Sequence, residues 1–153
     1  MARYAHDLYP GNVEFLDLQG LDIPFCDGND CYDKPIVSKL KQKIQNSKSI
    51  LIAGPIYNFD LNAAAKNLME LTGKAWSNKV VGFICAAGGK SSYMSPISYM
   101  NSLMLDYRSI IIPRFVYTDG EGFDSENNIT EPIKERIQEL VDFSILLSKN
   151  IEA

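Results

Sequence analysis

The chain has 153 residues, 46% of them hydrophobic and 22% charged, which is typical of a single globular domain that buries its own core. The formal net charge is −4 and the basic residues are spread along the chain, so no basic stripe indicates nucleic acid or an anionic membrane surface as a partner. No apolar run approaches the roughly 20 residues of a membrane span, and the first residues lack the apolar core of a signal peptide. We therefore expect one cytoplasmic domain over residues 1–153.

Four β-type runs are predicted, at residues 13–18, 49–54, 79–86 and 110–116. The second and third are nearly continuous apolar runs, as expected of strands that are covered on both faces. Pro113 interrupts the fourth run and cannot donate to a ladder, which predicts an edge strand or a bulged strand.

Helical patterns are predicted between and after these runs, at about 34–45, 61–72 and 95–105, and after Thr130. Asp33 can cap the first of them, and Gly73 closes the second. Strands that alternate with helices imply parallel pairing through right-handed crossovers. The predicted fold class is therefore α/β with three layers.

Three cysteines fit a reducing compartment. Cys26 and Cys31 lie in the loop CDGNDC and are predicted to be solvated thiols, with a disulfide or redox pair as the alternative. His6 is the sole histidine, so no metal site is expected. The acidic segment 119–128 is predicted to be a solvated loop, because its spacing lacks the regular ligand positions of an EF-hand.

Two loops at the carboxyl ends of neighbouring apolar runs carry signals of ligand binding. The first consists of Pro55, Ile56, Tyr57, Asn58 and Phe59, which present an aromatic ring and an amide where ligands bind in open α/β sheets. The second reads AAGGKSS over residues 86–92, and its glycines allow backbone N–H groups to approach a ligand closely. Each loop alone is equally compatible with an ordinary turn. Together they suit a flat ring with polar edges.

The order PIYN, then AAAKN, then a strand that ends in AAGGKSS resembles the NADPH-dependent FMN reductase family of flavodoxin-like flavoproteins. The resemblance runs from Val13 to about Val116, with departures at Ala65 and at Glu70-Leu71. It implies that residues 55–59 border the flavin ring and that the pyrimidine edge of the ring meets Ala87, Gly88, Gly89 and Ser91. No side chain is expected to be catalytic, because the flavin itself performs the hydride chemistry.

The resemblance further implies an NAD(P)H-dependent oxidoreductase that uses FMN and NADPH. Its acceptor would be a small molecule, namely a quinone, an azo compound, a metal ion or free flavin. The alternative is a non-catalytic α/β remnant that has lost FMN and acts as a binding or assembly module. The family also implies a homodimer or homotetramer. Core packing or such an interface would explain the side chains of Met69, Met94, Met100, Met104, Tyr93, Tyr99 and Tyr107.

Members of the family begin with a strand and a G-S-x-R-x-x-S-type loop that binds the FMN phosphate at a helix N-terminus. The present sequence begins instead with residues that resemble the end of that first helix. In the flavodoxin-like strand order 2-1-3-4-5 the first strand is central, so the runs 13–18 and 49–54 would lie about 9.6 Å apart. Three outcomes are open: the sequence starts at an internal Met, the two runs pair directly, or another chain fills the gap. We expect a longer natural form of the protein to bind FMN several orders of magnitude more tightly than this chain does.

Overall fold

The computed structural model describes residues 1–11 and 13–150. Its helices are α1 (Ala2–Asp7), α2 (Pro35–Asn46), α3 (Ala63–Thr72), α4 (Ile97–Tyr107) and α5 (Glu131–Asn150). Its strands are β1 (Ser49–Tyr57), β2 (Asp60–Leu61), β3 (Val80–Ala86), β4 (Ile110–Ile111) and β5 (Val116–Thr118). Short 3-10 turns cover Asp30–Asp33, Gly73–Trp76, Lys90–Ser92 and Gly120–Gly122. None of the helices in the described ranges is long and apolar enough to cross a membrane.

The sheet is mainly parallel, which confirms the predicted α/β class. β3 pairs in parallel with β1, β4 and β5, and only the short β2 runs antiparallel, beside β1. β4 lies at the start of the predicted run 110–116, β5 begins at the last residue of that run, Val116, and Pro113 lies in the break between them. The predicted interruption at this proline is therefore confirmed.

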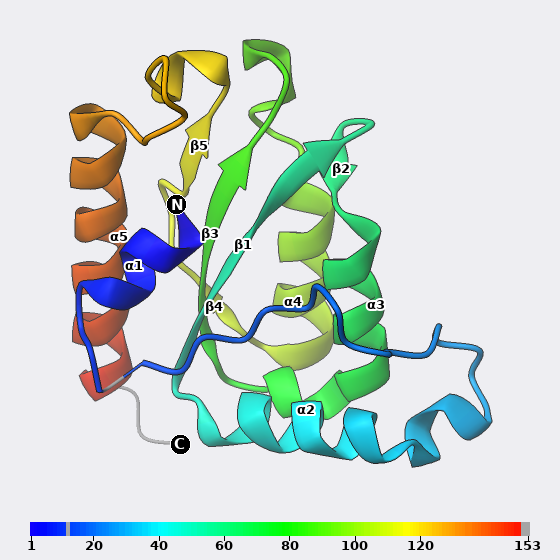
Figure 1. Cartoon of the computed structure of the whole chain (residues 1–153). Helices are drawn as coiled ribbons and strands as arrows, with labels where there is room; N and C mark the ends of the chain where they lie inside the picture. The colour runs from blue at the N-terminus through cyan, green and yellow to red at the C-terminus, as the bar shows by residue number, and fades with distance from the viewer. Residues whose placement is uncertain (12, 151–153) are drawn as a thin grey trace.

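The helices form a layer on each face of the sheet (Figure 1). α2, α3 and α4 belong to one core cluster, which includes Trp76, Phe83 and Leu103. α1 and α5 belong to the opposite cluster, which includes Val80 and Ile137. The side chains of β3 contribute to both clusters, and six of the seven residues of this strand are buried. β3 is thus the centre of the fold.

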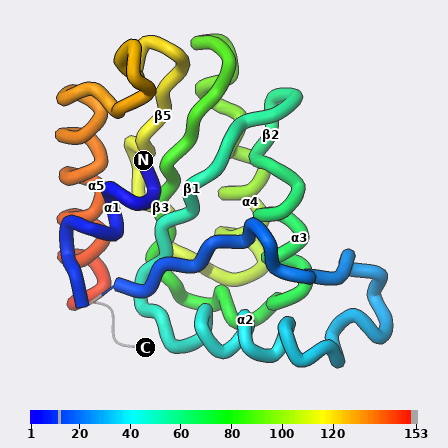
Figure 2. The backbone as a smooth tube through the Cα atoms, in the orientation of Figure 1, coloured from blue at the N-terminus to red at the C-terminus, as the bar shows by residue number. Residues whose placement is uncertain are grey.

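The predicted strand over residues 13–18 is wrong. These residues take no strand pairing. The smooth trace shows the segment crossing in front of β1 rather than extending the sheet (Figure 2). Leu16 and Leu18 pack against the cluster under α2–α4, which explains their apolar pattern. Alternating apolar residues form a strand only where a neighbouring strand can make backbone hydrogen bonds with them. Among the described residues, no strand lies between this segment and β1. Direct pairing of the two runs is therefore excluded among the three outcomes.

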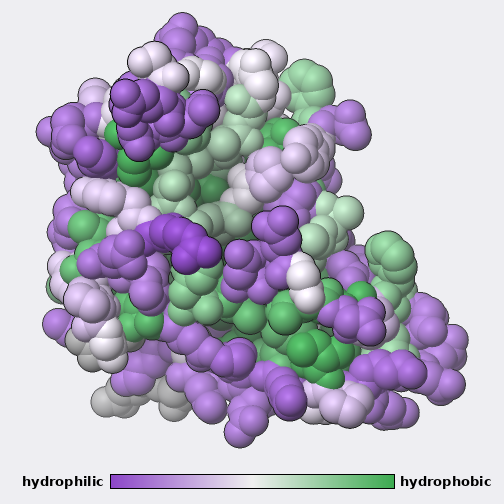
Figure 3. Space-filling view, in the orientation of Figure 1, coloured by the Kyte–Doolittle hydropathy of each residue, from purple (hydrophilic) through white to green (hydrophobic). Residues whose placement is uncertain are grey.

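β1 was expected to be covered on both faces, and its side chains do meet a core cluster on each face, Ile50 and Ile52 on one and Leu51 on the other. Over Ser49–Pro55 it pairs only with β3, and Ala53 and Pro55 are exposed. In the space-filling view, apolar surface lies in a hollow in the region of β1 (Figure 3). β1 is consequently an edge strand whose apolar run is half-buried.

The loop that contains Cys26 and Cys31 is held by α3. The Asn67 side chain accepts the Cys26 N–H at 2.9 Å and donates to the Pro24 carbonyl at 2.9 Å. Both cysteines are free thiols. Cys31 is only 3% exposed because its turn packs against α2 and α3, so the prediction of a solvated thiol is wrong at this position.

Gly82 supplies a stability test of the β3 core. A Cβ at this position would approach the methyl groups of Leu51, Leu140 and Ile112 to 2.7, 3.0 and 3.3 Å. We expect Gly82→Ala to lower the free energy of unfolding by about 1–3 kcal/mol, because the packed core must shift. The measurement is chemical denaturation followed by circular dichroism.

Gly88→Ala is the matched control, because a Cβ at Gly88 meets nothing within 4 Å. It should change the free energy of unfolding by less than about 0.5 kcal/mol. Equal denaturation midpoints for the wild type and Gly82→Ala would contradict the packing described for β3.

Candidate functional site

The two predicted loops lie side by side and line one open cavity. Parallel pairing places Pro55 opposite Ala86, so β1 and β3 end at the same edge of the sheet. The cavity measures about 550 Å³, within the range of small-molecule sites. Its lining residues are Ile56, Asn58, Phe59, Gly88, Gly89, Ser91 and Ser92. We call this cavity the slot.

The first wall of the slot is a tight hairpin that sequence analysis did not predict. Antiparallel pairing sets Tyr57 opposite Asp60, with Asn58 and Phe59 as the two turn residues. Both turn residues have positive φ, 51° and 61°, as a two-residue hairpin turn of the primed type requires. Asn tolerates this conformation, whereas for a bulky residue such as Phe it is unfavourable. The strained Phe59 is 67% exposed and Tyr57 is 64% exposed, so two aromatic rings project from this turn.

Asp60 and Asn62 fix the hairpin to its surroundings. One Asp60 carboxylate oxygen accepts the Leu61 N–H at 2.8 Å and the Ser98 hydroxyl at 2.6 Å, which ties the turn to the start of α4. Asn62 caps α3 by accepting the Ala65 N–H at 3.1 Å. A Cβ on Gly54 would collide with the Asn62 side chain, so this glycine allows the cap to lie against β1.

The second wall, residues 86–92, is held from the side of β5. The Ala87 N–H donates to the Thr118 carbonyl at 2.9 Å, and the Tyr117 hydroxyl donates to the Gly89 carbonyl. Lys90 pairs with Glu121 at 2.6 Å, and this carboxylate raises the pKa of the Lys90 amine. A Cβ on Gly88 or Gly89 would meet nothing within 4 Å, so the glycines leave open space beside the backbone.

The structure brings six of the nine predicted site residues to the slot, namely Ile56, Asn58, Phe59, Gly88, Gly89 and Ser91. Pro55, Tyr57 and Ala87 belong to the same two loops but do not line this cavity. Ser92 also lines it. The sequence places Ser92 in the second loop, AAGGKSS, but it was not among the residues predicted to meet the ring.

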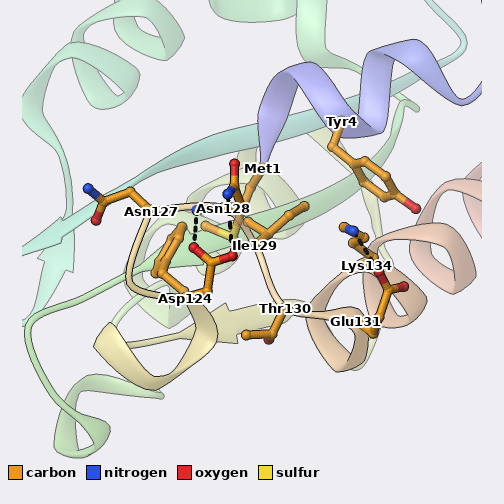
Figure 4. Close-up of a pocket in the computed structure, with 10 residues that line it drawn as sticks. Met1, Tyr4, Asp124, Asn127, Asn128, Ile129, Thr130, Glu131 and Lys134 are labelled. Atoms are coloured by element: carbon orange, nitrogen blue, oxygen red, sulfur yellow. Dashed lines mark hydrogen bonds and ion pairs between the residues drawn. The ribbon is translucent and has the colours of Figure 1, made fainter.

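A second, larger cavity of about 680 Å³ lies between α1 and the start of α5 and contains none of the predicted site residues. Figure 4 shows that its charged side chains face groups of the cavity itself. Asp124 accepts the N–H groups of Glu126 and Asn128 at 2.8 and 2.9 Å, and the bond from Asn128 in particular lowers the pKa of its carboxyl. Lys134 pairs with Glu131 at 2.6 Å. The carboxylate of Asp124 therefore builds the turn before α5, and the charged groups of this cavity already have partners within it.

The lining of the slot fits a flat, uncharged heterocycle. None of its seven residues carries a formal charge. One wall offers an aromatic side chain and an amide, and the other offers open backbone and two hydroxyls, which can hydrogen-bond the polar edge of a ring. A flavin ring has both an apolar plane and such an edge. Among the described residues, no group of three His, Cys, Asp or Glu side chains is arranged to hold a metal ion.

Comparison with known proteins gives concordant results. Residues 1–124 match the family described as NADPH-dependent FMN reductase. An NADPH:quinone oxidoreductase from Arabidopsis thaliana is 30% identical, over 92% of this chain and 79% of that protein. An NADPH azoreductase from Bacillus sp. (strain OY1-2) is 25% identical, over 78% of this chain and 67% of that protein.

Solved structures share the fold. The flavoenzyme NAD(P)H:(acceptor) oxidoreductase FerB from Paracoccus denitrificans superposes with a TM-score of 0.76 at 20% identity, over 97% of this chain and 87% of that one. An FMN-dependent NADH-azoreductase from Bacillus anthracis, solved in complex with FMN, gives a TM-score of 0.61 at 15% identity, over 95% and 87%.

The bond between Ser98 and Asp60 tests how the first wall is held. We expect Ser98→Ala to increase the hydrogen-exchange rate of the Phe59–Leu61 amides about threefold to tenfold, because the hairpin loses its tie to α4. Ser102→Ala is the control, since that hydroxyl bonds only to the Ser98 carbonyl within α4, at 3.3 Å. Indistinguishable exchange in both variants and the wild type would show that the hairpin is rigid without the tie.

Proposed function

Because the chain belongs to the NADPH-dependent FMN reductase family, we propose that it is an NAD(P)H-dependent flavin oxidoreductase. It takes two electrons from NADPH through FMN and passes them to a small acceptor. The observation that carries this proposal is the slot, in which two loops from neighbouring parallel strands face each other across an uncharged cavity. When bound, FMN supplies the hydride chemistry, and the protein binds and orients it.

The two loops have distinct parts in this proposal. Residues 55–59 border the plane of the ring, with Asn58 near its polar atoms. Ala87, Gly88, Gly89 and Ser91 meet the pyrimidine edge, where backbone N–H groups and a hydroxyl can donate to ring carbonyls. The absence of a side chain from both glycines is what leaves room for the ring.

The acceptor in this proposal is a flat aromatic molecule of the quinone or azo class. Related proteins are named as quinone oxidoreductase and azoreductase. The exposed rings of Tyr57 and Phe59 stand beside the slot and offer apolar surface against which a second planar molecule can stack.

Gly89 supplies the direct test of flavin binding. Its backbone is extended, with φ −175° and ψ 171°, so a β-branched residue can adopt it without strain. We expect Gly89→Val to fill the slot and to raise the Kd for FMN at least about tenfold. The measurement is quenching of FMN fluorescence in a titration, with NADPH oxidation in the presence of a quinone as the second readout.

Two controls sharpen this test. Gly120→Val adds the same side chain where a Cβ also meets nothing within 4 Å, outside the slot, and should leave the Kd unchanged. Riboflavin has the same ring without the phosphate and should bind within about threefold of FMN, because the slot lining is uncharged. A wild-type protein that binds neither flavin would overturn the proposed function and favour a non-catalytic binding module.

We further propose that the protein is a homodimer that buries one face of α4. Ile97, Met104 and Leu105 recur at helical spacing and are 46%, 45% and 75% exposed. Tyr93 and Met94, just before the helix, are 41% and 59% exposed. By contrast, Met69, Tyr99 and Met100 are buried and belong to the core. Apolar side chains gathered on one surface are characteristic of interfaces.

Leu105→Glu tests this interface, because a charge at its centre would have to be buried without a partner. We expect size-exclusion chromatography with light scattering to give a dimer for the wild type and a monomer for the variant. Leu146→Glu on α5, where the leucine is 55% exposed, is the matched control and should remain dimeric. A monomeric wild type would contradict this proposal without affecting that of flavin binding.

We also propose a reducing compartment, the cytoplasm, as the location of the protein. Cys26, Cys31 and Cys85 are all free thiols, and Cys26 and Cys31 lie five residues apart in one loop. Proteins of oxidising compartments usually convert such cysteines into disulfides.

A further inference from the structure

The Tyr117 hydroxyl provides a hydrogen bond from the sheet to a glycine of the slot. Tyr117 lies on β5 and is 8% exposed, and it donates to the carbonyl of Gly89, 28 residues earlier in the chain. No sequence motif relates the two positions. The parallel pairing of β5 with β3 brings them together.

Tyr117 is itself held firmly on two sides. Arg136 on α5 donates to the carbonyls of Tyr117 and Phe115, both at 3.2 Å, which fixes the backbone of β5. The Tyr93 ring stacks on Phe115 at 4.8 Å and meets the Tyr117 ring edge-on at 5.4 Å. The phenol oxygen is therefore fixed by packing before it contacts the loop.

The bond has a geometric consequence for the slot. The Gly89 carbonyl and the Lys90 N–H belong to one planar trans peptide and point in opposite directions. When the carbonyl is held on Tyr117, the N–H is turned away from β5. Glycine on one side leaves this peptide free to rotate in the absence of such a bond. The hydroxyl of Tyr117 thus selects one orientation of the peptide that follows Gly89, a lining residue of the slot.

We propose that Tyr117 is a positioning residue for the flavin, a role that rests on the proposed function. Its hydroxyl holds the Gly89–Lys90 peptide in the orientation that leaves the amide free for the polar edge of the ring. The ring of Tyr117 packs against its neighbours, whereas its hydroxyl orients the peptide that follows Gly89. Tyr117→Phe separates the two, because it keeps the ring and removes the bond.

The test compares Tyr117→Phe with Tyr9→Phe. The Tyr9 hydroxyl donates to Asp142 on α5, outside the slot, so the control also loses one hydroxyl and one hydrogen bond. Three quantities are measured: the Kd for FMN, the visible absorption band of the bound flavin, and hydrogen exchange of the residue 88–91 amides without FMN. For Tyr117→Phe we expect a Kd about threefold to tenfold higher, a shifted absorption band and exchange at least about fivefold faster. Tyr9→Phe should match the wild type in all three.

The outcomes separate this inference from the proposed function. A wild type that binds no FMN overturns the proposed function, and this inference with it. If the wild type binds FMN and Tyr117→Phe has the same Kd and absorption band, only the inference fails. Faster exchange alone, with an unchanged Kd and spectrum, would show that the hydroxyl merely stabilises the loop, and would also overturn it.

Discussion

The parallel register between β1 and β3 is the constraint on which the site depends. Pro55 pairs with Ala86, 31 residues later in the chain, so the two loops leave the sheet at the same edge and at the same level. A register shifted by one residue would exchange the two faces of β1, and Ile50 and Ile52 would leave the cluster under α2–α4. Packing of these side chains therefore sets the geometry of the slot. Every other contact at the site refines a position that the register has already fixed.

The walls of the slot are held by different means. The first wall is a hairpin turn with two positive φ angles, tied to α4 through Asp60 and Ser98. The second wall is the loop that contains Gly88 and Gly89. A backbone hydrogen bond from Ala87 and the Tyr117 hydroxyl hold it to β5. Because Asp60, Ser98 and Tyr117 do not line the slot, these ties leave the space between the walls clear. An open slot with fixed sides is preorganised for a rigid planar ligand.

The uncharged lining also limits what the slot can recognise. Stacking and neutral hydrogen bonds suit the ring of a flavin, whereas a phosphate gains most from charge-assisted bonds worth about 1.5–3 kcal/mol each. The seven lining residues offer none of these. The lining of the slot therefore suits the ring of a flavin and offers no charged group to its phosphate.

The sequence predicts the parts of this fold whose signals are local. The apolar runs of β1 and β3, the interruption at Pro113 and the two loops with their glycines all follow from composition and order. The segment 13–18 was wrongly predicted as a strand because its alternating apolar residues reflect the packing of Leu16 and Leu18 against the core. Strand pairing depends on a neighbouring strand, which the local sequence does not reveal. Cys31 is buried through contacts with α2 and α3, and Tyr117 meets Gly89 through strand pairing. Such long-range contacts have no signature in one sequence.

We propose that one slot, between residues 56–59 and 88–92, receives the flavin ring. Titration of the isotope-labelled protein with riboflavin, followed by amide chemical shifts in NMR spectra, tests where the ring binds. The largest shifts should fall in those two loops and on Tyr117. Shifts concentrated at the second cavity, around Asp124 and Thr130, would contradict it.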